Sequence, residues 1–464
     1  MFIKNSKIVC TIKKIVNNNY LFYSLLGFNI LFCLLNIYKQ IFFFGVLFFV
    51  LNFLFIFLTS RKKIFYLLFF LYPLARVLKF PNIGTSIFTL LLGFSYVILI
   101  LRFFIDKQKI TTQTIFTSAL FLSYVLLTFI VSLINRGFAW NELLSYYLYL
   151  AFPFVAFVCY SNRSDCDGTN NLLFCMTSYL CGMLITIAFY KIVPNGIKML
   201  NNLGVNVFEM GAAGIRFSPL TDDPNYGTAL ILLLSCIFIL AKKSKIQKIV
   251  GYPIMIIALG LSCLSISKML IGGIFVLLIC FMILIMKKID NLIINSSIIL
   301  IAFLGIIIFL STSLGTSLLI RTIGTRDGLS LNRITSGRTE LFGAYSSYIL
   351  SNPLVVVFGK GPLFIDSVTF RLGEHNTFTK NVFGSGLIGV SLILIAFYIM
   401  AKNRFDRLDS LPKSPFTFGF AVCLFVCCMS LGLAPSTVFP IFVVSCQFAD
   451  LNNQSFNLFM EVTI

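Results

Sequence analysis

Residues 269–286 read MLIGGIFVLLICFMILIM, a run without a charged side chain. In a helix, about 20 apolar residues cross the hydrocarbon core of a bilayer. Similar runs recur along nearly all of the 464 residues, of which 58% are hydrophobic and 11% charged, with a mean hydropathy of +0.97. A soluble globular domain carries roughly 25% charged residues. The sequence therefore predicts an all-α polytopic membrane protein.

Apolar runs of this kind define the expected membrane spans. All are expected to be helices, because a lipid-exposed segment must satisfy its own backbone hydrogen bonds. The predicted spans lie near residues 20–37, 41–58, 64–80, 85–104, 114–134, 143–160, 172–190, 227–241, 249–266, 269–286, 293–311, 381–401, 416–433 and 435–449. The last contains Pro435 and Pro440 in a short run and is either a span or a re-entrant segment. We therefore expect about 12–14 transmembrane helices.

Two connections, 191–226 and 312–380, are too long to be simple links. Loops of this length in a compact protein are usually functional or disordered. They divide the chain into N-terminal spans (1–190), a first long loop (191–226), central spans (227–311), a large loop (312–380) and C-terminal spans (381–464).

The basic residues indicate the orientation. The chain has 36 Lys and Arg against 16 Asp and Glu, a net charge of +20, but the basic residues lie between apolar runs, which argues against nucleic-acid binding. With the N-terminus inside, most of them fall in short inner connections, as the positive-inside rule requires. No small-residue cleavage site follows the first apolar run, which predicts a retained first span. Both long loops then lie on the outer face.

The large outer loop is expected to contain a helix over residues 338–350. Leu341, Tyr345, Tyr348 and Ile349 share one face at helical spacing. Ser351-Asn352-Pro353 is a plausible helix end. We expect this helix to lie on or near the membrane surface.

His375 is the only histidine of the chain and lies in the outer loop, just before a span. A histidine side chain with an unperturbed pKa of about 6.5 can accept a proton from a hydroxyl at neutral pH. A structural or incidental role is the alternative that its position leaves open.

Arginines form a second candidate set on the outer face. Their planar guanidinium groups suit a phosphate or pyrophosphate, although each one taken singly could equally be a solvated charge. The set comprises Arg216, Arg321, Arg326, Arg333, Arg338 and Arg371.

Four further patterns give a weaker functional signal. The sequence Asp222-Asp223-Pro224 is better explained as a helix start, with Asp223 as N-cap, than as a catalytic carboxylate pair. Gly359-Lys-Gly361 lacks the spacing of a phosphate-binding loop. Lys268 near a span end is either functional or a snorkelling side chain. The 13 cysteines show no metal-ligand spacing and are interpreted as packing residues.

Four segments together resemble the O-antigen ligase and O-antigen polymerase superfamily of membrane glycosyltransferases. They are Gly214–Asn225, with an exterior Arg and a Pro-Asn that opens a span; Leu261–Lys268; Ser336-Gly-Arg338 with Gly359-Lys-Gly361; and His375-Asn376 with Gly386-Leu-Ile-Gly389. The resemblance covers roughly residues 210–400. Lys268 stands where the family usually has Arg, which weakens the case for bidentate anion binding there.

The resemblance implies a GT-C-like membrane fold in the bacterial inner membrane, with a cytoplasmic N-terminus and periplasmic long loops. It implies transfer of a saccharide from an undecaprenyl-diphosphate donor to a sugar hydroxyl, without metal or other cofactor. Arg216 and Arg338 would neutralise the diphosphate, and His375 would act on the acceptor hydroxyl. Substrate-binding candidates are Arg321, Arg326, Arg333, Arg371, Lys268 and Asn376.

Among the functions that this resemblance leaves open, we expect an O-antigen polymerase, because the extra spans and the second long outer loop are more typical of polymerases. The alternatives are an O-antigen ligase, which transfers the glycan to lipid A-core, and a flippase of lipid-linked oligosaccharide. The expected partners are lipid-linked glycans, the bilayer, a chain-length regulator and a flippase, and no nucleic acid.

Overall fold

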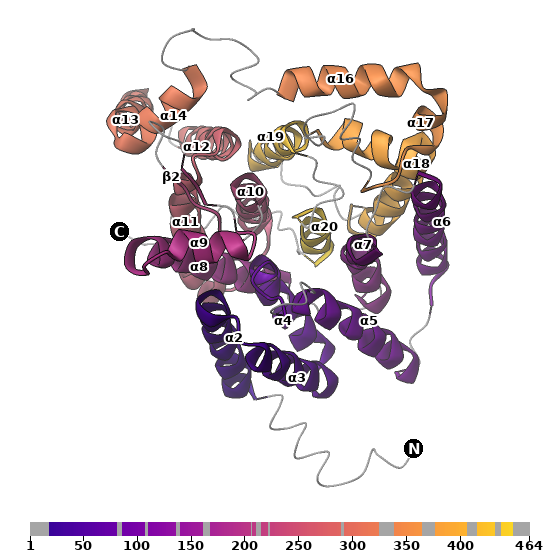
Figure 1. Cartoon of the computed structure of the whole chain (residues 1–464). Coiled ribbons are helices and arrows are strands. Elements are labelled where there is room, and N and C mark those ends of the chain that lie inside the picture. The colour runs from indigo at the N-terminus through magenta and orange to yellow at the C-terminus, as the bar shows by residue number, and fades with distance from the viewer. Residues whose placement is uncertain are drawn as a thin grey trace.

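A computed structural model of the chain describes residues 18–80, 86–106, 110–135, 140–160, 168–205, 207–209, 215–220, 223–288, 292–323, 338–363, 376–405, 415–431 and 438–448. Most of these residues are helical (Figure 1). The extended part is a short antiparallel hairpin in which β1 (Phe208–Glu209) pairs with β2 (Ile215–Arg216).

A helix lies in each of the predicted spans. In chain order these are α2 (Asn19–Lys39), α3 (Phe42–Leu58), α4 (Arg61–Leu71), α5 (Ile87–Ile105), α6 (Thr112–Asn135), α7 (Trp140–Tyr160), α8 (Gly168–Ile192), α10 (Pro224–Leu240), α11 (Lys245–Ser262), α12 (Lys268–Lys288), α13 (Leu292–Ser311), α18 (Thr377–Phe405), α19 (Pro415–Ser430) and α20 (Val438–Phe448). Among the described residues, eight helices are long and apolar enough to cross a membrane, and α3, α10 and α19 are shorter apolar helices. The prediction of an all-α, multi-pass membrane protein is confirmed.

The segment predicted as a span at 64–80 is not one continuous helix. Helix α4 ends at Leu71 and is followed by a single 3-10 turn, η1 (Tyr72–Leu74). Pro73 has no backbone N–H and so cannot continue the helical hydrogen-bond ladder. At the start of α5, the Ile87 amide donates to the Leu78 carbonyl at 2.8 Å.

Helix α10 is the central helix of the bundle. Its residues are buried almost throughout, including the whole stretch 227–238. It packs against α8, α11, α12, α19 and α20 (Figure 1). A helix that is apolar on every side is expected in the interior of a large assembly of helices rather than at its edge.

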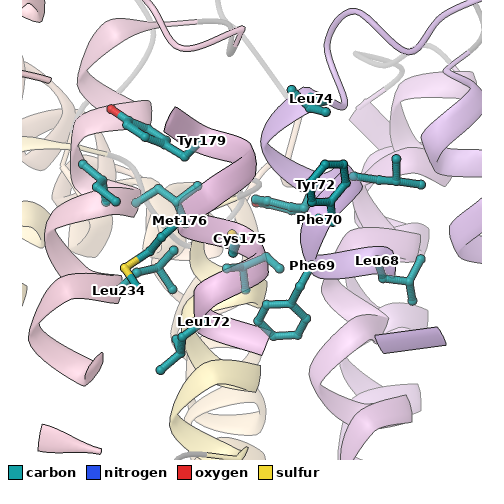
Figure 2. Packing of buried hydrophobic residues seen from close by; sticks show 14 of the residues in the cluster. Leu68, Phe69, Phe70, Tyr72, Leu74, Leu172, Cys175, Met176, Tyr179 and Leu234 are labelled. Carbon is teal, nitrogen blue, oxygen red and sulfur yellow. The ribbon is translucent and has the colours of Figure 1, made fainter. Parts of the chain in front are cut away.

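The largest hydrophobic cluster joins this central helix to the N-terminal half of the chain. Figure 2 shows Leu68 and Phe69 of α4 on one side, Leu172 and Met176 of α8 in the middle, and Leu234 of α10 beyond them. Each of these side chains is almost completely buried. Close packing of this kind fixes how α4, α8 and α10 lie relative to one another.

Hydrogen bonds at the two ends of α8 define two ends of the bundle. Thr169 at the start of α8 donates to the Lys242 carbonyl, just beyond α10, at 2.8 Å. Thr186 near the other end donates to the Ser218 carbonyl, ahead of α10, at 2.8 Å. Helices α8 and α10 are therefore antiparallel, and we refer to the two ends as the Lys242 end and the Arg216 end.

Connections predicted to share the inner side also lie together at the Lys242 end. Asn170, next to Thr169, donates to the Tyr66 hydroxyl of α4 at 3.4 Å. At the start of α4, Arg61 forms an ion pair with Asp106 at 2.7 Å. This agrees with the alternation of spans expected from the charges; which end faces the cytoplasm stays a prediction.

Both long loops contain short helices. The first loop has α9 (Gly196–Asn202), and the second has α14 (Ser313–Ile323), α16 (Arg338–Ser351) and α17 (Pro353–Phe358). Helix α16 confirms the helix predicted over 338–350.

The predicted apolar face of α16 packs against protein. Tyr345 and Ile349 are buried in a small cluster with Val355 of α17 and Phe383 of α18. The Tyr345 and Phe383 rings meet edge to face, with centroids 5.2 Å apart. This face is therefore not the one turned to the membrane surface, because α17 folds back and brings α18 against it.

A kink at Gly386 lets α17 approach α18. The backbone of Gly386 leaves the helical conformation, with φ 63° and ψ 178°. A Cβ at this position would lie 2.2 Å from the Val357 carbonyl oxygen. Beside the kink, the Lys360 amide donates to Phe383 O at 2.7 Å, and the Gly361 amide to Gly384 O at 2.8 Å.

We predict that Gly386→Ala lowers the thermal unfolding midpoint of the purified protein substantially. The backbone conformation alone would cost an Ala on the order of 1–3 kcal/mol, and the clash with the Val357 carbonyl adds to it. Gly343→Ala is the matched control, because a Cβ there meets nothing within 4 Å. Equal midpoints for both variants, measured in the same detergent, would contradict the described kink.

Candidate functional site

The structure places the side chains of three candidate residues. Arg216 and Asn376 are buried, and Lys268 is half-buried. For Arg321 in α14 and Arg338 at the first position of α16, the backbone is described and the side chain is not. His375, Arg326, Arg333 and Arg371 lie outside the described residues.

Arg216 links two of the segments that carry the family resemblance. Its Nε donates to the Ser265 carbonyl oxygen at 2.8 Å, and its Nη2 donates to Asn225 Oδ1 at 3.0 Å. Its exposed fraction is 7%. A buried guanidinium requires hydrogen-bond partners, and both of these acceptors are neutral. The two contacts therefore orient Arg216.

Further hydrogen bonds hold the same two segments together. Ser265 Oγ donates to the Phe217 carbonyl at 2.7 Å, and the Phe217 amide donates to the Leu264 carbonyl at 3.3 Å. Ser267 Oγ donates to Asn225 Oδ1 at 3.3 Å. We call the group of Arg216, Asn225, Ser265 and Ser267 the arginine clasp.

Two helices begin beside the arginine clasp. Helix α10 starts at Pro224 and has Asp223 as its N-cap, with the Asp223 carboxylate accepting from the Asn225 amide at 2.6 Å. The interpretation of Asp223 as a helix start is therefore confirmed. Helix α12 begins at Lys268. Helix N-termini carry a partial positive charge that favours anions. Because the Asp223 carboxylate already caps α10, the groups at this end of the bundle that suit an anionic ligand such as a phosphate are Arg216, Lys268 and the start of α12.

Asn376 has a capping role at the start of α18. Its Oδ1 accepts from the Phe378 and Thr379 amides at 2.8 and 3.3 Å, as expected of an asparagine that precedes a helix. Its Nδ2 contacts Met429 Sδ at 3.5 Å, and the next residue, Thr377, donates to the Leu431 carbonyl at 2.5 Å. These contacts tie the residue after His375 to the C-terminal end of α19.

Contacts along α19 place Asn376 at the Arg216 end. Helix α19 packs against α12. Pro415, where α19 begins, accepts from Cys280 Sγ of α12 at 3.2 Å, whereas Cys423 contacts the Gly273 carbonyl, closer to Lys268, at 3.7 Å. Helix α19 is therefore antiparallel to α12 and ends, next to Asn376, on the side where α12 begins. Asn376 and the arginine clasp share one end of the bundle.

The other two segments of the resemblance also meet. The backbone bonds from Lys360 and Gly361 to α18, together with the kink at Gly386, join Gly359-Lys-Gly361 to the Gly386–Gly389 region. The glycines allow close packing here. The four segments thus form two contacting pairs. Asn225 and Ser265 are the acceptors that hold Arg216, a role that their residue types alone did not indicate.

The described residues contain no group of three or more His, Cys, Asp or Glu side chains arranged to hold a metal ion. The cysteines described are free thiols, and Cys236, Cys280 and Cys423 are buried between helices. This agrees with the packing role predicted for them.

Comparison with known proteins adds no relative. No protein-family model matches the chain, and no curated protein matches it. The family resemblance therefore rests on the four segments themselves.

We predict that Arg216 and Asn225 are energetically coupled. In a double-mutant cycle, Arg216→Ala and Asn225→Ala should each lower the unfolding free energy, and the double variant should lose less than the sum by about 0.5–3 kcal/mol. Thr169→Ala, which breaks a bond to the Lys242 carbonyl at the opposite end of the bundle, is the control partner for Arg216→Ala and should be nearly additive. Additive losses for the Arg216–Asn225 pair would contradict the clasp.

Proposed function

We propose that the chain is an O-antigen polymerase, which joins undecaprenyl-diphosphate-linked oligosaccharide repeat units into polysaccharide at the periplasmic face of the bacterial inner membrane. The observation that carries the proposal is the arginine clasp at the start of α10 and α12. It brings two distant segments of the family resemblance into contact and presents a buried, positively charged side chain beside two helix N-termini.

Diphosphate binding is the role proposed for this end of the bundle. Arg216 and Lys268 would attract the donor's diphosphate, and the N-terminus of α12 would add to the attraction. Arg338 begins α16 and would complete the charge around the leaving group. Stabilising charge that develops on a leaving group is commonly the largest contribution to catalysis of this kind.

Proton removal from the acceptor sugar is the role proposed for His375. The acceptor oxygen forms a bond to the anomeric carbon of the donor, the bond from that carbon to the diphosphate breaks, and the diphosphate leaves with the electron pair. The hydroxyl proton passes to His375. Asn376 supports this role, because its cap on α18 and its contact with Met429 fix the chain directly after His375.

Lipopolysaccharide from a deletion strain tests the polymerase proposal. We predict lipid A-core that carries a single repeat unit, because one unit can still be transferred when polymerisation is lost. Core without any repeat, together with accumulated lipid-linked polymer, would instead identify a ligase. Purified protein that moves lipid-linked units between the leaflets of liposomes without extending them would identify a transporter.

Single substitutions test the residues. We predict that His375→Ala and Arg338→Ala each abolish glycan polymerisation while the protein remains inserted in the membrane, because both residues lie outside the predicted spans. Lys198→Ala, which removes an exposed charge from α9 in the other long loop, is the control and should leave glycan length unchanged. Normal chain length in both His375→Ala and Arg338→Ala would overturn the assignment.

A further inference from the structure

The corner between α16 and α17 exposes apolar side chains although it lies within the large loop. Leu350 is 76% exposed and Leu354 is 75% exposed. Val357 and Phe358 of α17 are exposed as well. Leaving such side chains in water is unfavourable, and four exposed apolar side chains within nine residues indicate a contact with another apolar phase.

The α16–α17 corner lies near the end of a helix that could span the membrane. Helix α17 packs against α6 and α18, and Figure 1 shows it beside α18 near one end of α6. A Cβ on Gly361, which follows α17, would lie 2.7 Å from Ser132 Oγ. Ser132 is in the last turn of α6, within one helical pitch of about 5.4 Å from its end. In the same turn of α6, Ile134 is 73% exposed, on a helix long and apolar enough to span the membrane.

The backbone of the corner is compatible with a lipid environment. Non-helical backbone is tolerated at membrane depth only where protein satisfies its polar groups. The Asn352 amide donates to Ile349 O at 3.1 Å, the Val355 amide to Asn352 O at 2.9 Å, and the Gly359 amide to Val355 O at 3.0 Å. The exit from the corner is paired with α18 through Lys360 and Gly361, as described above.

Charge is absent from the sequence of this region. Residues 341–359 read LFGAYSSYILSNPLVVVFG and contain no Asp, Glu, Lys or Arg. Lys360 follows at once and is half-buried. A lysine at the edge of an apolar segment can extend its ammonium group toward the headgroups.

We propose that the α16–α17 corner is inserted into the bilayer and that Leu350, Leu354 and Phe358 contact lipid acyl chains in the leaflet around the end of α6. The partner of this surface is the membrane itself. The proposal does not depend on the proposed glycosyl transfer. If the corner is inserted, the bilayer anchors the large loop near its middle, between α16 and α18.

Tryptophan fluorescence with brominated lipids tests the proposal, because Trp140 is the only tryptophan in the chain. The background is full-length Trp140→Phe, which keeps an aromatic ring beside Phe129, whose ring centroid is 6.0 Å from that of Trp140. Leu354→Trp is added and the protein is reconstituted in bilayers with and without bromine on the acyl chains. Leu350→Trp is the second reporter, should the first variant fail to fold.

Two further single-tryptophan variants calibrate the measurement. Ile134→Trp places the reporter at an exposed apolar position of α6 and serves as the reference for lipid contact. Lys198→Trp places it on α9 at an exposed position that a charged residue normally occupies and serves as the reference for water contact. We expect brominated lipid to reduce the Leu354→Trp emission by the same fold as that of Ile134→Trp, with little quenching by aqueous acrylamide. Quenching by acrylamide alone, as expected for Lys198→Trp, would overturn the proposal. Protection from both quenchers would also overturn it and would indicate a covering protein surface.

Discussion

Lipid offers no hydrogen bonds to a polypeptide backbone, and the structure follows from this constraint. The predicted spans contain helices because a helix pairs its own amides and carbonyls. Where the helical ladder breaks, at Pro73 after α4 and at Gly386 in α18, other parts of the chain take over the pairing. The amides of Lys360 and Gly361 reach the carbonyls of α18 in this way. The loop that carries α16 and α17 is therefore bound to the bundle through its backbone.

The same requirement explains why Arg216 is held where it is. A buried guanidinium must find oxygen acceptors, and two of them come from Ser265, just after α11, and from Asn225, at the start of α10. Satisfying one side chain consequently fixes the relative positions of three helix ends, including the start of α12. Asn376 does the same on a smaller scale for α18 and α19. Positive charge and ordered chain ends thus gather at one end of the bundle.

Much of the fold could be predicted from the sequence, because long apolar runs determine spans directly. The prediction of one continuous span over 64–80 was wrong, because it followed the apolar character of the whole segment and ignored Pro73 as a helix breaker. The partners of Arg216 could not be predicted, because Ser265 contributes its backbone carbonyl, which every residue possesses. The contact of Tyr345 with Phe383 depends on how α17 turns, and no local pattern encodes that turn. The cap formed by Asn376, by contrast, could be predicted from its position directly before a helix.

The burial of α10 has a consequence for assembly. Of the helices that pack against it, α8 precedes it in the chain, whereas α11, α12, α19 and α20 follow it. Much of the surface of α10 therefore faces lipid before these later helices are inserted. Its surface must therefore suit two surroundings in succession. Its polar side chains allow this, because Ser235 donates to Ile231 O at 2.7 Å and Thr228 to Asn225 O at 2.9 Å within the helix itself. Neither hydroxyl needs a partner on a later helix. Both therefore stay hydrogen-bonded when protein replaces lipid around α10.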